Sequence, residues 1–192
     1  VTESLKPVSI RKQGDKHILD IGQNMAGWLR IRIKGQAGDS IRLRFAERLQ
    51  PDGEIFTKNL RDAHCTDIYV VSGRELQDAT WAPRFVYHGF RYVEISGYPN
   101  AKTEDFTAEV VDDEMAHTGT FTGSDETLNQ VLRNAFWGIR SNYKGMPVDC
   151  PQRNERQPWL GDHAMGSWGE SLFFNNHALY NKWTRDIREA QR

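Results

Sequence analysis

The sequence is poor in cysteine and has no excess of charge of either sign. Its 192 residues include two cysteines, Cys65 and Cys150, and neither belongs to a CxxC motif or a cysteine/histidine cluster with metal-ligand spacing. We therefore expect two buried thiols, with a disulfide as the alternative, and neither a metal nor another cofactor. The formal net charge of −1 argues against a nucleic-acid partner, because such binding requires a basic face.

Long apolar runs are also absent. None approaches the roughly 20 residues that span a bilayer, so we expect no membrane segment. The first residues, "VTESLKPVSIRKQGDKH", lack a signal-peptide core and an initiator methionine. The last, "NKWTRDIREAQR", look like the interior of an amphipathic helix without a stop signal, so we expect an excerpt of a longer chain.

The first half of the chain has the pattern of antiparallel β-structure. Apolar residues alternate with arginine and lysine in "GWLRIRIK" and "SIRLRFA", the period of half-buried strands. A Pro-Asp-Gly turn stands at residues 51–53, and β-branched and aromatic residues dominate "DIYVVSG", "FVYHGFRYVEISGYP" and "DFTAEVV". Many short strands without an intervening helical pattern predict a β-sandwich.

Near residue 120 the apolar period becomes that of a helix. One stripe at three- and four-residue steps comprises Leu128, Val131, Leu132, Ala135, Phe136 and Ile139. Ser124 is the expected N-cap, with Asp125 and Glu126 in the first turn. Four-residue spacing predicts two further helices, one with Ala164, Trp168 and Leu172 and one with Leu179, Trp183 and Ile187.

This change of period, between Asp113 and Thr120, gives the domain boundary. We expect a β-sandwich over residues 1–115 and a helical domain over residues 116–192. Three helices alone would expose a broad apolar face, whose expected members are Leu128, Phe136, Trp168 and Trp183.

Most catalytic motif classes are missing from the sequence. There is no phosphate-binding GxxxxGK[ST] loop, no dinucleotide-binding GxGxxG, no HExxH zinc motif and no GxSxG nucleophile elbow. The six histidines are scattered, so local spacing predicts no metal site.

What remains is a charged loop between two helical patterns, "DCPQRNERQPWLGD", residues 149–162. Carboxylates and arginines hydrogen-bond sugar hydroxyls, and an indole packs on the apolar face of a pyranose. Glycoside hydrolysis needs one carboxylic acid to protonate the leaving oxygen and a second carboxylate. Glu155 is the candidate acid, because neighbouring groups can position it and Trp159 can exclude water. On residue types alone, an ordinary solvated loop stays open as the alternative.

The segment "PVDCPQRNERQPWLGD" resembles the signature of the bacterial α-L-rhamnosidases, glycoside hydrolase family 78, which reads approximately Asp-Cys-Pro-x-Arg-x-Glu-Arg followed by Trp-x-Gly-Asp. Upstream, "DIGQNMAGWLRIRIKGQAGDSIRLRFAERLQPDGEI", "TDIYVVSG" and "WAPRFVYHGFRYVEISGYP" resemble the family's β-sandwich domain. "FTGSDETLNQVLRNAFWGIRSNY" resembles the first helix of its (α/α)₆ barrel. The resemblance covers essentially the whole chain and implies an antiparallel β-sandwich followed by the first helices of that barrel.

The resemblance also implies roles for individual residues. Glu155 matches the general acid, and four residues match contacts to the rhamnose: Asp149, Arg153, Trp159 and Asp162. We expect Arg156 to orient the carboxylates, and Cys150 and Pro151 to shape the loop. Asn154 and Gln157-Pro158 depart from the family's usual residues.

The implied mechanism is inverting, with a distant carboxylate activating water. The family's general base is a glutamate far along the barrel, and no residue of 163–192 matches it; Glu170 and Glu189 are not candidates. We therefore expect the isolated chain to lack hydrolase activity.

The expected partner is a rhamnose-containing oligosaccharide or glycoside, in a periplasmic or extracellular setting rather than the cytoplasm. A homo-oligomer is left open. The alternatives are a non-catalytic carbohydrate-binding or structural module and an (α/α)₆ hydrolase of another sugar. For the aromatic residues that would form a binding platform on the sandwich, core packing is the better explanation. They are Trp81, Phe85, Tyr87, Phe90 and Tyr92.

Overall fold

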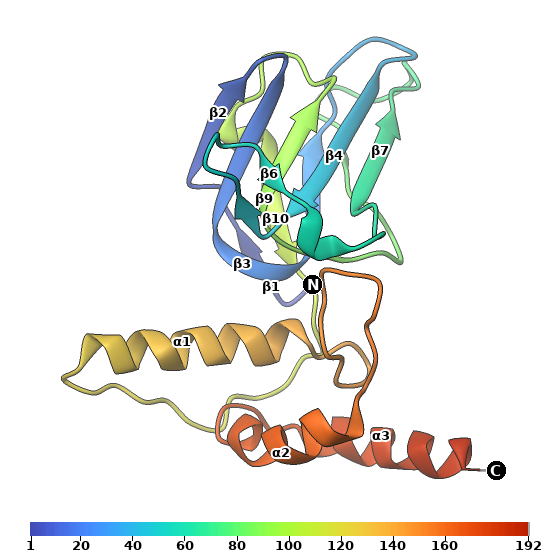
Figure 1. Ribbon diagram of the computed structural model, residues 1–192. Helices are drawn as coiled ribbons and strands as arrows, with labels where there is room; N and C mark the ends of the chain where they lie inside the picture. The colour runs from blue at the N-terminus through green and yellow to red at the C-terminus, as the bar shows by residue number, and fades with distance from the viewer. Residues whose placement is uncertain (192) are drawn as a thin grey trace. The chain divides into compact units, whose positions relative to one another are not determined.

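The computed structural model describes residues 1–191, which form two compact units (Figure 1). The first, the sheet unit, consists of residues 1–111 together with residues 152–154. The second, the helical unit, consists of residues 112–151 and the residues from 155 onward. The expected order of antiparallel strands followed by helices is confirmed.

The sheet unit is built on one curled, eight-stranded antiparallel sheet. Its central path runs β1-β10-β3-β9-β4-β7, and β2 and β8 both pair with β3. These strands are β1 (Glu3–Leu5), β2 (Ser9–Gln13), β3 (Lys16–Arg32), β4 (Ser40–Ala46), β7 (Thr66–Val70), β8 (Thr80–Trp81), β9 (His88–Ser96) and β10 (Phe106–Val110). A separate two-stranded ribbon joins β5 (Arg48–Leu49) to β6 (Ile55–Phe56), and two 3₁₀ turns span Lys58–Leu60 and Thr103–Asp105.

Strand β3 organises this sheet, because at 17 residues it is long enough to pair with four neighbours. Its first part bonds to β2, and its last part bonds to β10 and β8. Its register with β9 shifts between Asp20 and Met25, an irregularity of the kind that bends a strand. The bend gives the sheet its sandwich-like curl (Figure 1).

The alternating pattern of the sequence marks the inner face of the sheet correctly. Leu29 and Ile31 of β3 and Leu43 and Phe45 of β4 are completely buried, and the arginines between them are exposed or half-buried. In β10 the expected face is also buried, with Phe106 and Ala108 fully enclosed. Burial of these side chains, at about 1.5–3 kcal/mol each, is the main source of the unit's stability.

The expectation that the sheet's aromatic residues pack in the core holds only in part. Phe90 is completely buried, and Trp81, Tyr87 and Tyr92 are half-buried. Phe85 contradicts the expectation, because it is fully exposed and has a φ of 62°. It precedes β9 in a loop, so strand alternation does not apply to it.

Three helices make up most of the helical unit: α1 (Glu126–Ser141), α2 (Leu160–Ser171) and α3 (His177–Ala190). A small cluster of Tyr143, Phe174 and Leu179 forms its centre, and Phe136 packs against it. The expected N-cap of α1, Ser124, is wrong. Asp125 caps the helix, since its carboxylate accepts from the backbone amides of Thr127 (2.8 Å) and Leu128 (3.2 Å).

The two later helices differ in how well their apolar spacing predicts burial. In α3, Leu179 and Trp183 are buried as expected. In α2 the expected stripe lies outside the core, because Trp168 is 84% exposed and Leu172, just after the helix, is 69% exposed. The buried face of α2 carries His163 instead.

Both cysteines are buried thiols with no disulfide between them, which confirms the expectation. Within residues 1–191, none of the helices combines the length and apolar character that a membrane crossing requires.

Candidate functional site

The charged loop begins directly after a tight turn that follows α1. Residues 142–148 form this turn. The amide of Val148 donates to the carbonyl of Asn142 (2.8 Å), and Tyr143 and Pro147 form an antiparallel bridge. Gly145 forms the bend, where a φ of 74° favours glycine. The turn delivers the chain to residue 149 in a fixed direction.

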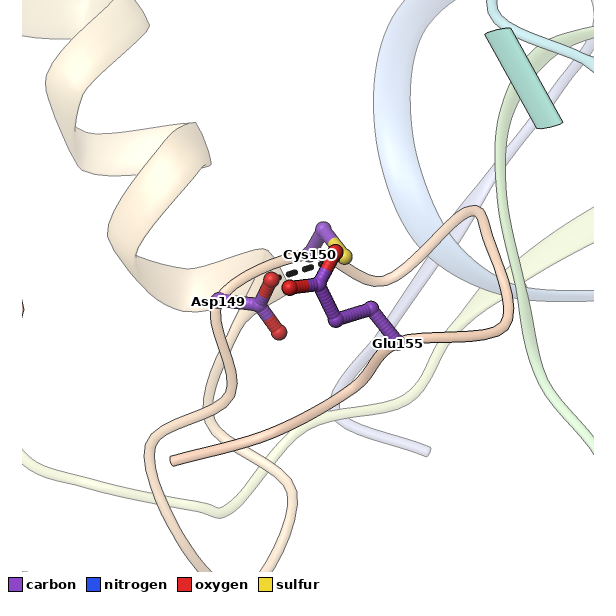
Figure 2. A group of neighbouring side chains, drawn as sticks. All are labelled: Asp149, Cys150 and Glu155. Carbon is purple, nitrogen blue, oxygen red and sulfur yellow. Dashed lines mark hydrogen bonds between the residues drawn. The ribbon is translucent and has the colours of Figure 1, made fainter. Parts of the chain in front are cut away.

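Asp149 closes the base of the loop with its backbone and its side chain. The Asp149 amide donates to the carbonyl of Gln157 (3.0 Å), and the Gln157 amide donates back to Asp149 Oδ1 (2.7 Å). The Cys150 thiol donates to Asp149 Oδ2 (3.2 Å), as Figure 2 shows. Both carboxylate oxygens therefore accept bonds from the loop itself, which fixes their orientation.

Glu155 lies beside Asp149 inside this closed loop. Each side chain in the group of Asp149, Cys150 and Glu155 has a donor or acceptor atom within 4.8 Å of the others (Figure 2). The indole Nε1 of Trp159 donates to Glu155 Oε1 (3.1 Å). Glu155 is half-buried and Trp159 is 50% exposed, so a carboxyl held by an indole stands next to an indole surface open to ligand.

The same three side chains are the group in residues 1–191 with metal-ligand proximity. Two carboxylates and a thiolate are donors that a zinc ion accepts. Here, however, the Cys150 proton lies in a hydrogen bond to Asp149, and Glu155 accepts from Trp159. The arrangement is that of a hydrogen-bonded cluster, and the expectation of no bound metal stays a prediction.

The other two predicted sugar contacts are Arg153 and Asp162. Arg153 belongs to the sheet unit, along with Gln152 and Asn154. Asp162 is exposed in the first turn of α2, where the helix dipole favours a negative charge. Of the five residues predicted for the site, the structure brings together Asp149, Glu155 and Trp159.

Sequence reasoning missed a carboxylate network centred on Glu170, in the last turn of α2. Glu170 accepts hydrogen bonds from the hydroxyls of Tyr143 and Tyr180, each at 2.6 Å, and pairs with His163 Nδ1 at 3.6 Å. Burial opposes ionisation of Glu170, but the bonds from His163, Tyr143 and Tyr180 outweigh it and hold its pKa below the usual range. The available signal was the seven-residue spacing of His163 and Glu170, which places both on one face of α2.

Within the turn that precedes the loop, the Lys144 ammonium group also has a perturbed pKa. Burial lowers its pKa to about 8, although the carboxylates of Asp112 and Asp113 act in the opposite direction. Arg156, which the sequence predicts to orient the carboxylates, is half-buried, has a φ of 50° and repels the Lys144 charge.

Two family models match the chain. The bacterial α-L-rhamnosidase concanavalin-like domain matches residues 10–112, and the bacterial α-L-rhamnosidase six-hairpin glycosidase domain matches residues 116–192. Together they account for nearly all of the chain, and the charged loop falls in the second.

Individual proteins agree with these matches. A curated α-L-rhamnosidase of Formosa agariphila is 38% identical over 192 residues, which are 97% of this chain and 20% of that protein. The solved α-L-rhamnosidase of Dictyoglumus thermophilum superposes with a TM-score of 0.95 at 37% identity, covering 100% of this chain and 22% of its own. The Streptomyces avermitilis α-L-rhamnosidase, solved with L-rhamnose, superposes with a TM-score of 0.94 at 38% identity, covering 99% of this chain and 18% of that chain. The chain thus spans about a fifth of these relatives.

Proposed function

The chain belongs to the bacterial α-L-rhamnosidase family, and from this premise we propose that it supplies the acid half of an active site that hydrolyses terminal, non-reducing α-L-rhamnosides. The observation that carries the proposal is the closed loop in which Trp159 holds the Glu155 carboxyl beside Asp149.

Glu155 is the general acid. A general acid must place its proton within hydrogen-bond reach of the glycosidic oxygen. The Trp159 indole donates to Glu155 Oε1 and so helps to orient the carboxyl group that would carry the proton.

Asp149, Arg153, Trp159 and Asp162 are the proposed rhamnose contacts. A carboxylate whose two oxygens are oriented by the loop, as those of Asp149 are, accepts sugar hydroxyls with the lone pairs that remain. The exposed Trp159 offers an apolar surface to one face of the ring.

The general base is proposed to lie in the part of the relatives that this chain does not span. An inverting enzyme keeps its two carboxyls about 6.5–9.5 Å apart to admit water. Asp149 lies closer to Glu155 than that, because a carboxylate oxygen of one is within 4.8 Å of a carboxylate oxygen of the other. Both Asp149 oxygens also accept hydrogen bonds from the loop. Glu170 is not proposed as the base, because it accepts hydrogen bonds from two tyrosines and pairs with a histidine.

The proposal is tested with Glu155→Gln in a full-length enzyme that carries these residues. General acid catalysis contributes about 10²–10⁴-fold, so turnover of an alkyl α-L-rhamnoside should fall by that factor. An activated aryl rhamnoside, whose leaving group needs no proton, should lose far less. The matched control is Glu189→Gln, an exposed acid of α3 that should leave both rates unchanged. Equal turnover of wild type and Glu155→Gln on the alkyl substrate would reject Glu155 as the acid.

The stereochemical course is tested separately. Proton NMR of the first product should show β-L-rhamnose, the inverted anomer. Release of the α anomer would instead indicate a retaining mechanism, for which the short distance between Asp149 and Glu155 would make Asp149 the candidate nucleophile.

The 192-residue chain by itself should bind rhamnose without hydrolysing rhamnosides. Hydrolysis by the isolated chain that Glu155→Gln abolishes would show that the base lies within these residues.

A further inference from the structure

The middle of the charged loop is held by the sheet unit. Gln152, Arg153 and Asn154 cluster with the strands, whereas the residues on either side of them belong to the helical unit. Within the sheet unit, the Cys65 thiol donates to the backbone carbonyl of Gln152 at 3.0 Å. The Asn154 side-chain amide donates to the Asp62 carboxylate.

Gly89 of β9 makes this approach of the two backbones possible. A Cβ atom on Gly89 would lie 2.9 Å from Gln152 Cβ and 3.0 Å from both Gln152 Cα and Gln152 N. Two of these three atoms are backbone, so a side-chain rotation of Gln152 cannot relieve the crowding. Glycine is required here by close packing, since Gly89 has no left-handed φ.

Gln152, which Gly89 and Cys65 contact, lies three residues before the acid, and Asn154 is joined directly to Glu155. The base of the loop is closed by Asp149 and Gln157. Along the chain, Glu155 therefore lies between two held residues: Asn154, whose side chain donates to Asp62, and Gln157, whose amide donates to Asp149.

We propose that Gly89 and Cys65 are positioning residues for the general acid: they set the path of residues 152–154 and thereby the place of the Glu155 carboxyl. This rests on the proposed function of Glu155. An acid that must meet an oxygen at about 2.6–3.2 Å is sensitive to such shifts, and a displacement of 1 Å costs up to about 10²-fold in rate.

The test is Gly89→Ala in the full-length enzyme, with Val93→Ala as the matched control. Val93 is a completely buried residue of the same strand, and its truncation weakens the sheet core without adding an atom against Gln152. For Gly89→Ala we expect kcat on an alkyl α-L-rhamnoside to fall about 10-fold to 10²-fold. The loss on an activated aryl rhamnoside should be several times smaller. Val93→Ala should lower the melting temperature and leave the ratio of kcat on the alkyl substrate to kcat on the aryl substrate unchanged.

The leaving-group comparison separates positioning from mere structural damage. A misfolded fraction lowers both rates equally, whereas a misplaced acid lowers mainly the rate that needs a proton. Equal losses on the two substrates for Gly89→Ala would overturn the proposal.

Cys65 gives a second variant in case Gly89→Ala does not fold. Cys65→Ala removes the donor to the Gln152 carbonyl, and Cys65→Ser restores a hydroxyl donor at the same place. We expect a selective loss on the alkyl substrate for Cys65→Ala and its rescue in Cys65→Ser. Indistinguishable leaving-group profiles for wild type, Cys65→Ala and Cys65→Ser would remove Cys65 from the proposal.

Glu155→Gln, measured in parallel, keeps the two hypotheses apart. If Glu155→Gln shows the leaving-group dependence and Gly89→Ala does not, the acid assignment stands and the positioning role is wrong. If Glu155→Gln lacks it, the acid assignment itself fails.

Discussion

The two units of this chain bury their apolar residues to different extents. In the sheet unit, residues of four neighbouring strands, among them Leu19, Leu29, Phe45 and Phe90, are completely enclosed. In the helical unit, Tyr143 and a few partners are buried, while Val131 is 56% and Trp168 84% exposed. The sheet encloses its own core because it curls on itself, whereas three helices have too few neighbours to cover every apolar stripe.

The expected apolar face of the helical unit is therefore only partly confirmed. Leu128 and Trp168 are exposed as predicted. Trp183 is buried against His163 (ring centroids 5.6 Å apart), and Phe136 packs on the small central cluster. The contacts between helices that enclose these two rings could not be read from spacing alone.

The largest effect expected from this difference follows truncation of Phe45. Its ring is completely buried, stacks on His88 with centroids 4.1 Å apart and meets Phe90 edge-on at 4.8 Å. Phe45→Ala should cost about 3–5 kcal/mol in the free energy of unfolding, measured by urea denaturation. The half-buried Phe136 is the comparison. If Phe136→Ala costs as much as Phe45→Ala, the two cores do not differ as described.

Glu170→Gln should be the most damaging polar substitution in the helical unit. It removes the negative charge that accepts bonds from two tyrosine hydroxyls and pairs with His163. We expect the free energy of unfolding to fall by about 1.5–3 kcal/mol. Because the folded-state pKa lies below 4.5, the stabilisation by the ionised group is fully present above about pH 4.5 and is lost as the pH falls through the folded pKa. The unfolding free energy of wild type should fall with acid more steeply than that of Glu170→Gln, and parallel curves would contradict this account.

A smaller effect is expected at the start of α1. Asp125→Ala should cost about 1 kcal/mol in thermal unfolding followed by circular dichroism, because two backbone amides lose their acceptor. Ser124→Ala, one residue earlier, should cost almost nothing. The reverse order would restore Ser124 as the cap.

The smallest effect is expected at Trp168. Since its indole is 84% exposed, Trp168→Ser should change the unfolding free energy by less than about 0.5 kcal/mol. It should also lower the binding of a hydrophobic dye to the chain. A loss of stability comparable to that of Phe136→Ala would show that this indole packs more closely than its exposure indicates.

The sequence predicts the sheet better than the helices, for a physical reason. Strand alternation has a period of two, so one wrong assignment would reverse a whole face, and Leu29, Ile31, Leu43 and Phe45 all fall on the buried side. Helical spacing does not show which side of a helix is buried: Ala164 and Trp168 share a face of α2, yet the polar His163 is the buried residue. Glu170 of the same helix accepts hydrogen bonds from Tyr143 and Tyr180, and the pattern of apolar residues gives no information on such bonds.

The candidate site was predictable in composition but not in arrangement. The proximity of Asp149, Glu155 and Trp159 follows from a short loop closed between residues 149 and 157. The attachment of Gln152 to Cys65 joins residues 87 positions apart, and local patterns carry no information on such a contact. For the same reason the sequence does not show that residues 152–154 belong to the sheet unit.

The pairing of β3 with β10 sets the order in which the chain can fold during synthesis. Phe106 lies opposite Ile31, and Val110 opposite Gly27, so the centre of the sheet joins segments made early and late. Until residue 110 has left the ribosome, one side of β3 has no partner there, and such a bare strand edge is prone to pair with other chains. Nascent chains stalled before β10 should therefore aggregate or recruit chaperones, whereas chains stalled well beyond it should resist protease.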